Sequence, residues 1–491
     1  MIGQIVIIGL GPGDPEQITL KAWKVLEAAS EVYLRTKRHP SVGSLPEGVL
    51  YRSFDEVYEN HDSYAEVYEE IATRVVALGE RPQGVVYAVP GHPFMGETAV
   101  PRILELARER ALSTRVIAGV SFLEPVTTAL GIDPFEGLQV CDAMLLGQRH
   151  HPNLCPDVGA LIVQVCDRYV ASRAKITLMN LYHDDHPIRL VRHAGTEQQQ
   201  VRGLLLYELD RQEDLDHLTT AYIPPLPSPG SVSSFQNAVA RLRAPGGCPW
   251  DREQTHQTLR SELLEETYEV LAALDADDME ALEEELGDLM LQILFHAQLA
   301  TEDGDFKLID SVQHVIEKLV RRHPHVFGDE EVEDAAEVLQ NWERIKRAER
   351  GEEAFSSMLS GINRALPALS QAMEIQRRVA RVGFDWSSAE PVSAKVKEEL
   401  QEFHQASNAD ERLAEMGDLL FSLVNVARWH EIDAESALRQ ANRRFMERFT
   451  ALERRAQAQG IPLEEMTLEE MDALWEQAKG EGMGPGGASP D

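Results

Sequence analysis

The sequence predicts a multidomain chain in which an N-terminal α/β domain precedes all-α tandem helical-bundle domains. Two observations support this fold class. Up to about residue 225, short β-branched runs alternate with amphipathic helical segments, which is typical of an α/β fold with a largely parallel sheet. From residue 235 onward the apolar spacing is helical almost throughout, and one acidic pattern occurs there twice. A length of 491 residues fits about three domains.

In the N-terminal part we expect buried strands that feed helices. The expected strands cover 4–9, 84–91, 115–121 and 160–166, with closing strands at 188–195 and 203–210. Sheets of this kind bind ligands at the carboxyl ends of their strands. Three glycine-containing turns of this chain fall at such ends, so we expect a ligand site there.

The first of these turns, from Gly9 to Pro15, could be confused with a dinucleotide-binding fingerprint. The sequence argues against that interpretation, because Pro12 and Pro15 remove amide donors and Asp14 would repel a diphosphate. A neutral or cationic ligand, such as one with a sulfonium group, fits the turn better. From this motif alone, a tight strand-to-helix turn that binds nothing is an equal alternative.

Four motifs in this part together resemble the tetrapyrrole (corrin/porphyrin) methylases: GLGPGDPEQIT at 9–19, VPGHP at 89–93, IAGVSFLEP at 117–125 and LMNLY at 178–182. The resemblance implies a two-lobed α/β fold with S-adenosylmethionine bound in the cleft between the lobes. It places these residues near the cofactor: Gly11, Pro12, Gly91, His92, Ser121, Phe122 and Met179. His92 replaces the aspartate of the family's GDP motif, which leaves cofactor binding in place but weighs against methyl transfer to a tetrapyrrole.

A proline-rich segment separates the two parts of the chain. The stretch AYIPPLPSPGSVSS at 221–234 has no periodicity and is typical of a semi-rigid linker. We therefore expect a methylase-like domain at 1–225 and a linker at 226–234. The two helical domains are expected at 235–350 and 355–478, with a disordered tail at 479–491.

The helical part contains acidic residues with helical spacing. At 100° per residue, Glu262, Glu265, Glu266 and Glu269 share one helical arc. Glu285 and Asp288 stand three residues apart at the start of an apolar run, so they too face one way. Two antiparallel helices would bring the two sets of carboxylates together around a hard cation. The alternative is an amphipathic helix with an acidic, solvated face.

The repetition of this pattern favours the metal site. Glu399 and Glu402 repeat the spacing of Glu266 and Glu269, and Glu415 and Asp418 repeat that of Glu285 and Asp288. Each copy also keeps a glycine, Gly287 or Gly417, in mid-helix, where glycine costs about 1 kcal/mol relative to alanine. We therefore predict two metal sites, with ligands Glu266, Glu269, Glu285, Asp288, Glu399, Glu402, Glu415 and Asp418.

The ligand type suggests the chemistry. Carboxylate oxygens select Mg²⁺, or Mn²⁺, over zinc, and such ions usually share their coordination with water and substrate phosphates. A phosphoanhydride could be hydrolysed there, with Glu265 or Glu266 positioning the water. Candidate substrate-binding residues are Trp250, Lys318, Arg321, Arg322, Lys346, Arg444 and Arg448. Taken singly, each basic residue is more often an exposed helix charge, and each tryptophan a core residue.

The helical part also resembles the MazG nucleoside triphosphate pyrophosphohydrolases over about 235–478, in tandem. The motifs are GGCPWDREQTHQTLRSELLEETYEVL, ELGDLMLQILFHAQ, KLVRRHPHVFGD and NWERIKR, then GFDW, EELQE and EMGDLLFSLVN. The family's EExxE…ExxD metal motif falls on Glu265, Glu266, Glu269, Glu285 and Asp288, and on Glu398, Glu399, Glu402, Glu415 and Asp418. The resemblance implies Mg²⁺-dependent hydrolysis of nucleoside triphosphates to NMP and pyrophosphate. It also implies a site assembled from two domain copies, which predicts a homodimer; the alternative is that the two repeats pair within one chain.

The role of the N-terminal domain stays open at this point. It could be a methyltransferase in its own right, or a ligand sensor that regulates the hydrolase without catalysis. Calorimetry with S-adenosylmethionine and transfer of a labelled methyl group would distinguish these alternatives.

Composition excludes some partners and predicts a compartment. The net charge of −35 divides into −10 over residues 1–230 and −25 over 231–491, which argues against nucleic acid or an anionic membrane as a partner. The four cysteines lie far apart without metal-ligand spacing, and no stretch approaches a transmembrane helix. We expect a cytoplasmic protein with reduced thiols.

Overall fold

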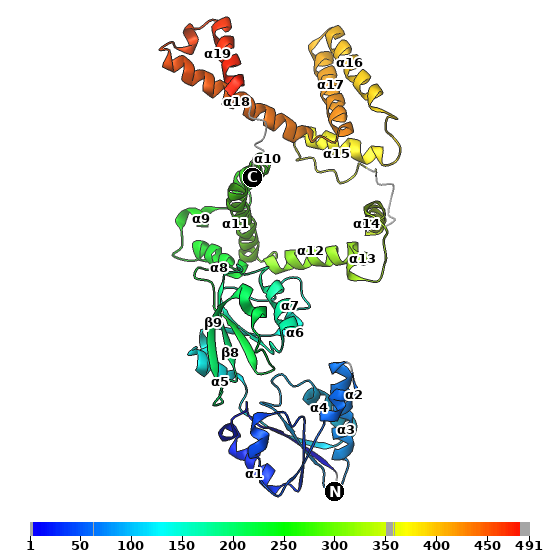
Figure 1. Ribbon diagram of the computed structural model, residues 1–491. Helices are drawn as coiled ribbons and strands as arrows, with labels where there is room; N and C mark the ends of the chain where they lie inside the picture. The colour runs from blue at the N-terminus through cyan, green and yellow to red at the C-terminus, as the bar shows by residue number, and fades with distance from the viewer. Residues whose placement is uncertain (1–2, 62, 350–356, 358, 482–491) are drawn as a thin grey trace. The chain divides into compact units, whose positions relative to one another are not determined.

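A computed structural model describes residues 3–61, 63–349, 357 and 359–481. The chain forms two compact units, Met1–Arg241 and Leu242–Asp491 (Figure 1). The first is an α/β unit and the second is helical, so the predicted fold class is confirmed. None of the described helices has both the length and the apolar character needed to cross a membrane.

The first lobe of the α/β unit is a five-stranded sheet in the order β3-β2-β4-β1-β5, in which every pair is parallel. Its strands are β1 (Gln4–Gly9), β2 (Glu31–Leu34), β3 (Leu50–Ser53), β4 (Val85–Val89) and β5 (Ser113–Ile117). Its helices are α1 (Leu20–Ala28), α2 (Asp55–Asn60), α3 (Tyr64–Gly79) and α4 (Ala99–Glu109). Ile5 and Ile7 of β1 belong to one buried cluster and Ile8 to another, because alternate strand residues face opposite sides of the sheet.

The second lobe is a mixed sheet in the order β6-β7-β10-β8-β9, in which only β6 and β7 run parallel. Its strands are β6 (Leu138–Asp142), β7 (Gly159–Val163), β8 (Pro187–Arg192), β9 (Gln200–Leu205) and β10 (Thr219–Ile223). Its helices are α5 (Leu123–Leu130), α6 (Ala143–Leu146) and α7 (Arg168–Leu178). The prediction of a largely parallel sheet therefore holds for the first lobe and is wrong for the second, where three of the four strand pairs are antiparallel.

Two predicted boundaries are corrected in this unit. The predicted strand at 203–210 ends at Leu205 and continues as a 3₁₀ helix, Leu206–Arg211. The proline-rich stretch at 221–234 is not all linker, because 221–223 belong to the fully buried β10 and α8 (Val232–Arg243) begins inside the linker predicted at 226–234. The strand β10 (TTAYI) is buried on both faces but contains two threonines and adjoins prolines, so it gave no apolar run that would indicate a strand.

The start of α8 is fixed to the second lobe by one carboxylate. Asp157 accepts hydrogen bonds from the backbone N–H of Gly230 at 2.7 Å and of Ser231 at 3.2 Å, and from the hydroxyls of Ser231 and Ser234. The hydroxyls of Ser231 and Ser234, followed by the backbone of Gly230, lower the pKa of Asp157 to about 2. The end of the proline-rich segment is therefore held in place within the first unit.

The helical unit contains two helical hairpins. In the first, α10 (Arg260–Ala276) packs against α11 (Met279–Asp303), and in the second, α16 (Ala389–Gln405) packs against α17 (Ala409–Trp429) (Figure 1). The other helices are α9 (Pro249–Glu253), α12 (Leu308–Arg322), α13 (Pro324–Phe327), α14 (Ala335–Glu349), α15 (Ala368–Ala380), α18 (Ala434–Ala458) and α19 (Leu468–Glu481). Residues 479–481 of the predicted tail are thus helical, and 482–491 lie outside the described residues.

Candidate functional site

The first hairpin brings together three of the predicted ligands. Asp277 ends α10 in the left-handed conformation (φ 55°), and Asp278 caps α11 by accepting hydrogen bonds from the N–H groups of Glu280 and Ala281. This tight connection makes the two helices antiparallel. Glu266 of α10 and Glu285 and Asp288 of α11 then each offer a carboxylate oxygen, and these oxygens lie within 4.8 Å of one another.

The second hairpin repeats this arrangement. Asn408 caps α17, and Glu399, Glu415 and Asp418 bring their carboxylate oxygens within 4.8 Å of one another. Glu399 is buried, with 5% of its surface exposed. Equivalent acids therefore meet in both copies, as the repeated spacing predicted.

Glu269 and Glu402 lie at the edges of these clusters rather than among the three closest carboxylates. Burial, followed by the charges of Asp288 and Glu269, raises the pKa of Glu266. Burial, then Glu399, likewise raises the pKa of Glu402, although Lys395 opposes this effect. Each cluster is thus an assembly of mutually repelling negative charges.

The donor set fits a hard divalent cation. Each cluster offers carboxylate oxygens alone, which is the ligand type that Mg²⁺ and Mn²⁺ prefer and zinc does not. Two positive charges would offset the repulsion that raises the pKa of Glu266. Exposed acidic groups also occur without a metal, so it is the burial of Glu399 and the second copy that favour a site.

In the N-terminal unit, the three predicted glycine turns converge. Gly11 and Gly91 form an antiparallel bridge, in which the Gly91 N–H donates to the Gly11 carbonyl at 2.8 Å. A Cβ on Gly9 would lie 2.3 Å from the Gly91 carbonyl oxygen, and one on Gly119 would lie 2.2 Å from the same atom. The carboxyl ends of β1, β4 and β5 can meet this closely only because glycine occupies both positions.

The other predicted cofactor residues are distributed more widely. Pro12 and Ser121 are buried. The Ser121 hydroxyl accepts a hydrogen bond at 3.1 Å from the backbone N–H of Leu123, the first residue of α5. Phe122 is half-buried beside it. The His92 ring accepts a hydrogen bond from the Phe94 N–H at 3.1 Å, as expected of a turn histidine. Met179 follows α7 in the second lobe and is 39% exposed.

Family models match three parts of this chain. Residues 4–210 match the Tetrapyrrole (Corrin/Porphyrin) Methylases, 254–327 the MazG nucleotide pyrophosphohydrolase domain, and 369–445 Phosphoribosyl-ATP pyrophosphohydrolase. The nucleoside triphosphate pyrophosphohydrolase/pyrophosphatase MazG of Thermotoga maritima is 47% identical over 242 residues, which is 49% of this chain and 93% of that protein. The chain belongs to the MazG family.

A full-length relative and a solved structure complete the comparison. A Bacillus subtilis protein, "Uncharacterized protein YabN", is 42% identical over 493 residues, covering 98% of this chain and 99% of its own length. A uroporphyrin-III-C-methyltransferase structure from Thermus thermophilus aligns with 45% of this chain and 94% of its own, with 21% identity and a TM-score of 0.37. This member of the MazG family thus matches the tetrapyrrole-methylase family model ahead of two pyrophosphohydrolase family models.

Two of the basic residues predicted to bind substrate in the first MazG repeat form ion pairs away from the acidic cluster. Arg321 and Arg322 both bind Glu349 of α14, with nitrogen–oxygen distances of 2.7 and 2.5 Å. The Arg322 guanidinium also lies 5.5 Å from the Trp342 ring centroid. Lys318 is exposed on α12, and the side chain of Lys346 lies outside the described residues. Among the described residues, no ion pair joins these groups to the acidic cluster, so their role stays a prediction.

Trp250 lies in different surroundings from those the sequence favoured, whereas Arg444 is the exposed helix charge that the sequence favoured. Trp250 is 60% exposed, so the expectation of a core tryptophan is wrong. Arg444 is exposed and Arg448 half-buried on α18. A cavity of about 670 Å³ follows the same helix, but it is lined by other arginines, among them Arg439, Arg443 and Arg454. Glu265 is exposed on α10, outside the three-carboxylate cluster.

A buried ion pair in the first lobe was missed by sequence reasoning. Arg35, directly after β2, lies 3.0 Å from Glu97, whose side chain is only 2% exposed. One oxygen of Glu97, the Arg35 Nε and the Tyr87 hydroxyl are buried, and none of them has a hydrogen-bond partner among the described residues. Burial raises the pKa of Glu97 to about 7, although Arg35 opposes the shift. The strand β2 was not predicted, so Arg35 could not be placed at a sheet end.

This pKa predicts a specific pH dependence of stability. Between about pH 4.5 and 7 the unfolded chain ionises at Glu97 while the folded chain keeps its proton, so rising pH should destabilise the fold over that window. In Glu97→Gln this dependence should disappear. We expect the thermal midpoint of Glu97→Gln, relative to that of wild type, to rise as the pH increases from 5 to 7.5. Calorimetry on the full chain measures both midpoints. An unchanged difference between the two midpoints would rule out the raised pKa.

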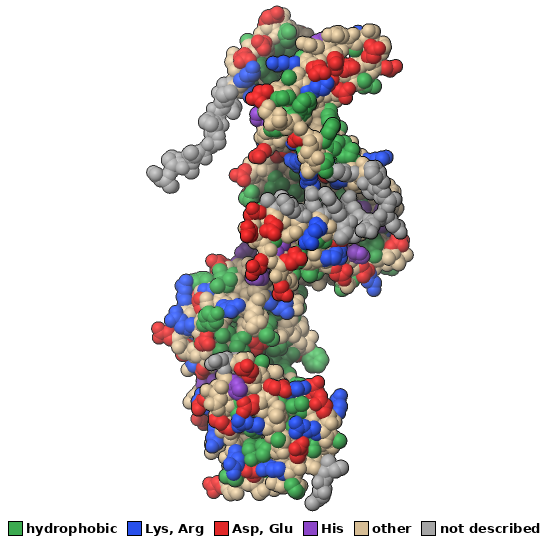
Figure 2. Space-filling model, turned by 90° about the vertical axis from the view of Figure 1, so that its right-hand side faces the viewer, with side chains coloured by type: hydrophobic (Ala, Val, Ile, Leu, Met, Phe, Trp, Pro, Cys, Tyr) green, Lys and Arg blue, Asp and Glu red, His purple; other side chains and the backbone are tan. Residues whose placement is uncertain are grey.

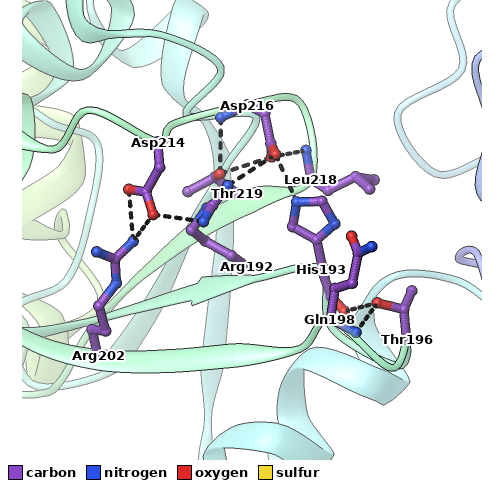
Figure 3. A network of polar contacts seen from close by, with 9 residues as sticks. All are labelled: Arg192, His193, Thr196, Gln198, Arg202, Asp214, Asp216, Leu218 and Thr219. Carbon is purple, nitrogen blue, oxygen red and sulfur yellow. Dashed lines mark hydrogen bonds and ion pairs between the residues drawn. The ribbon is translucent and has the colours of Figure 1, made fainter.

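A second polar network, in the second lobe, was also missed (Figure 3). Asp216 lies 2.7 Å from His193 Nε2 and accepts from the Thr219 hydroxyl at 3.0 Å and the Leu218 N–H at 2.9 Å. Burial alone would raise the pKa of Asp216, but these hydrogen bonds lower it below its usual value. Next to Asp216, the Asp214 carboxylate accepts hydrogen bonds from the guanidinium groups of Arg192 and Arg202. The network ties the loop before β10 to β8 and β9.

Proposed function

We propose that the helical unit hydrolyses nucleoside triphosphates to NMP and pyrophosphate in a Mg²⁺-dependent reaction at its acidic clusters. The observation that carries this proposal is that each hairpin gathers carboxylate oxygens from three acids within 4.8 Å. The Thermotoga relative is named a nucleoside triphosphate pyrophosphohydrolase, which supports both the substrate class and the reaction of this proposal. Mn²⁺ should replace Mg²⁺ at such oxygen ligands.

The acids of each cluster would have two roles, binding the cation and orienting the attacking water. Glu266, Glu285 and Asp288 would hold the cation, with Glu269 at the edge; in the second hairpin Glu399, Glu415 and Asp418 would do so, with Glu402 at the edge. The bound cation would polarise a phosphoryl oxygen and neutralise the leaving pyrophosphate. A carboxylate that is not fully engaged by the metal, Glu265 or Glu266, would orient the attacking water.

The substrate would be oriented by groups outside the clusters. We propose that Trp250, which is 60% exposed, stacks on the base. The phosphates would be met by Lys318, Arg321, Arg322, Lys346, Arg444 and Arg448. For Arg321 and Arg322 this requires exchange of their bonds to Glu349. Phosphate can replace that carboxylate because it accepts the same bidentate hydrogen bonds.

The test of this activity is product identification. The full-length chain is incubated with a panel of nucleoside triphosphates and Mg²⁺, and products are separated by chromatography. NMP with pyrophosphate, lost on chelation of the metal, supports the proposal. NDP with inorganic phosphate, or no turnover of any nucleotide in the panel, contradicts it.

We propose that two copies of the chain associate through the helical unit. On α11, Leu286, Met290 and Ile293 form one stripe at helical spacing, and they are 49%, 41% and 49% exposed. The helix α12 buries none of its residues, and Ile309 and Ile316 are 67% and 54% exposed. Apolar stripes of this extent usually pack against another helix, and a second copy of the same surface satisfies them symmetrically.

Light scattering tests this association. The expected mass is twice the 54.9 kDa of one chain. Ile316→Glu should reduce the mass to that of one chain, whereas Glu317→Lys, an adjacent exposed change, should not. A monomeric wild type with full hydrolase activity would indicate instead that the two repeats pair within one chain.

For the N-terminal unit we propose binding of S-adenosylmethionine at the glycine turns, by a methyltransferase-like domain. A Cβ on Gly91 would meet nothing within 4 Å, so there is open space beside this turn for a ligand. The family match over 4–210 supports the cofactor. Gly11, Pro12, Gly91, His92, Ser121, Phe122 and Met179 would surround it. The alternative is a sensor that binds a ligand and regulates the hydrolase without transferring a methyl group.

Two measurements separate these roles. Calorimetry with S-adenosylmethionine tests binding, and labelled-methyl transfer into a cell extract tests catalysis. Binding without transfer favours the sensor, and it should then change the rate of nucleotide hydrolysis. No binding contradicts both cofactor-dependent roles.

We propose that the protein acts in the cytoplasm, with neither nucleic acid nor membrane as a partner. Its four cysteines are free thiols, as suits a reducing compartment. The net charge of −35 repels nucleic acid and anionic lipid surfaces. Cell fractionation with an epitope-tagged chain would test the location.

A further inference from the structure

The two acidic clusters differ at one position that the repeat aligns. Glu399 and Glu402 follow Glu266 and Glu269 by 133 residues, and the same offset places Lys395 opposite Glu262. The acids of the clusters are the same in both copies, so this exchange of a negative for a positive side chain is a difference in charge at the site itself.

Lys395 is bonded to the second cluster. Its Nζ lies 2.7 Å from Glu399 Oε1 and 2.9 Å from Glu398 Oε1. Glu399 is one of the three clustered ligands, and its side chain is only 6% exposed. Water largely screens an ion pair between exposed residues four apart on a helix, but a pair that engages a buried carboxylate is screened less.

The first cluster lacks this ammonium. Glu262 occupies the matched position, and its carboxylate accepts a hydrogen bond from the Ser261 hydroxyl at 3.0 Å. Within the described residues, no lysine or arginine forms an ion pair with Glu266, Glu285 or Asp288. A divalent cation at the first cluster would therefore meet unpaired carboxylates, whereas one at the second would meet an oxygen that already binds Lys395.

We propose that Lys395 makes the two repeats unequal, so that the first cluster binds the divalent cation alone and the second binds it well only together with the nucleotide. In the free protein Lys395 takes a lone pair of Glu399 and repels the incoming cation. When the triphosphate arrives, its negative charge attracts both positive groups, and the flexible lysine can move from Glu399 to a phosphate oxygen. Lys395 is thus a positioning residue of the second site. This inference rests on the metal-dependent hydrolysis proposed above.

The test is Mn²⁺ binding, measured by calorimetry on the full-length chain without turnover. Glu285→Gln with Asp288→Asn confines binding to the second cluster. In that background Lys395→Gln should tighten Mn²⁺ binding about tenfold in the absence of nucleotide. Lys395→Arg, which keeps the charge, should bind Mn²⁺ as weakly as the unmodified second cluster. A non-hydrolysable triphosphate analogue should strengthen binding of Mn²⁺ when Lys395 is present and do so less in Lys395→Gln.

The reciprocal change tests the same idea in the first repeat. With Glu415→Gln and Asp418→Asn removing the second cluster, Glu262→Lys should weaken Mn²⁺ binding to the first cluster about tenfold. If Mn²⁺ binds the wild type but neither Lys395→Gln nor Glu262→Lys changes its affinity, this inference is overturned while the proposed function stands. If the wild type binds no Mn²⁺ at either cluster, both are overturned.

Discussion

A variant in which Glu285, Asp288, Glu415 and Asp418 are all changed to their amides is expected to lose nucleotide hydrolysis by about 1,000-fold or more. Each amide keeps the shape of the side chain but removes a charge that would hold the cation. A catalytic cation contributes several kcal/mol to transition-state stabilisation, and each 1.36 kcal/mol is a factor of ten in rate. The measurement is release of pyrophosphate from nucleoside triphosphates at saturating Mg²⁺.

The control is Glu283→Gln, which removes the same charge from an exposed position on another face of α11 and should leave the rate unchanged. The two double variants, one for each repeat, then assign the activity to the first hairpin, the second or both. Hydrolysis that persists in the quadruple variant would place the reaction outside these clusters.

Thermal stability gives an independent check that the loss is chemical. In the metal-free protein, burial and neighbouring acids raise the pKa values of both Glu266 and Glu285, so removing charge from the first cluster relieves repulsion. The quadruple variant should therefore unfold at the same temperature as wild type or higher. A lower midpoint would show that the carboxylates stabilise the fold instead.

The carboxylate clusters could be predicted from sequence because helical periodicity decides which side chains share a face. Glu285 and Asp288, three residues apart, must point the same way, and a short connection such as Asp277–Asp278 makes the two helices antiparallel. What periodicity cannot give is the distance between the helices along their length. Glu269 therefore fell at the edge of the cluster although its spacing is as regular as that of Glu266.

The basic residues and the N-terminal polar groups could not be predicted in the same way. The pairing of Arg322 with Glu349 depends on how α12 meets α14, which no local pattern specifies. The Arg35–Glu97 pair joins residues 62 positions apart, one directly after β2 and the other just before α4. The three glycine turns were predictable only as turns; their mutual contact follows from the strand order β4-β1-β5.

That contact leads to the second large expected effect: Gly9→Ala should destabilise the N-terminal unit by about 3 kcal/mol. The new Cβ would lie 2.3 Å from the Gly91 carbonyl oxygen and 2.7 Å from the Gly119 nitrogen, and both are backbone atoms that cannot move alone. Calorimetric unfolding of the full-length chain measures the change. The matched control is Gly43→Ala, whose Cβ would meet nothing within 4 Å in a 3₁₀ segment, Pro40–Ser44, and which should be neutral. If Gly9→Ala is as stable as Gly43→Ala, the three turns do not meet as described.

Gly91→Ala separates the packing of these turns from the binding of a ligand. Gly91 has φ 61°, so alanine there carries the strain of a left-handed residue, about 1–2 kcal/mol, but its Cβ enters open space. If that space receives S-adenosylmethionine, Gly91→Ala should weaken calorimetric binding about tenfold or more while the unit stays folded. Tight binding in Gly91→Ala together with lost binding in Gly9→Ala would mean that the turns support the fold of the lobe and that the ligand lies elsewhere.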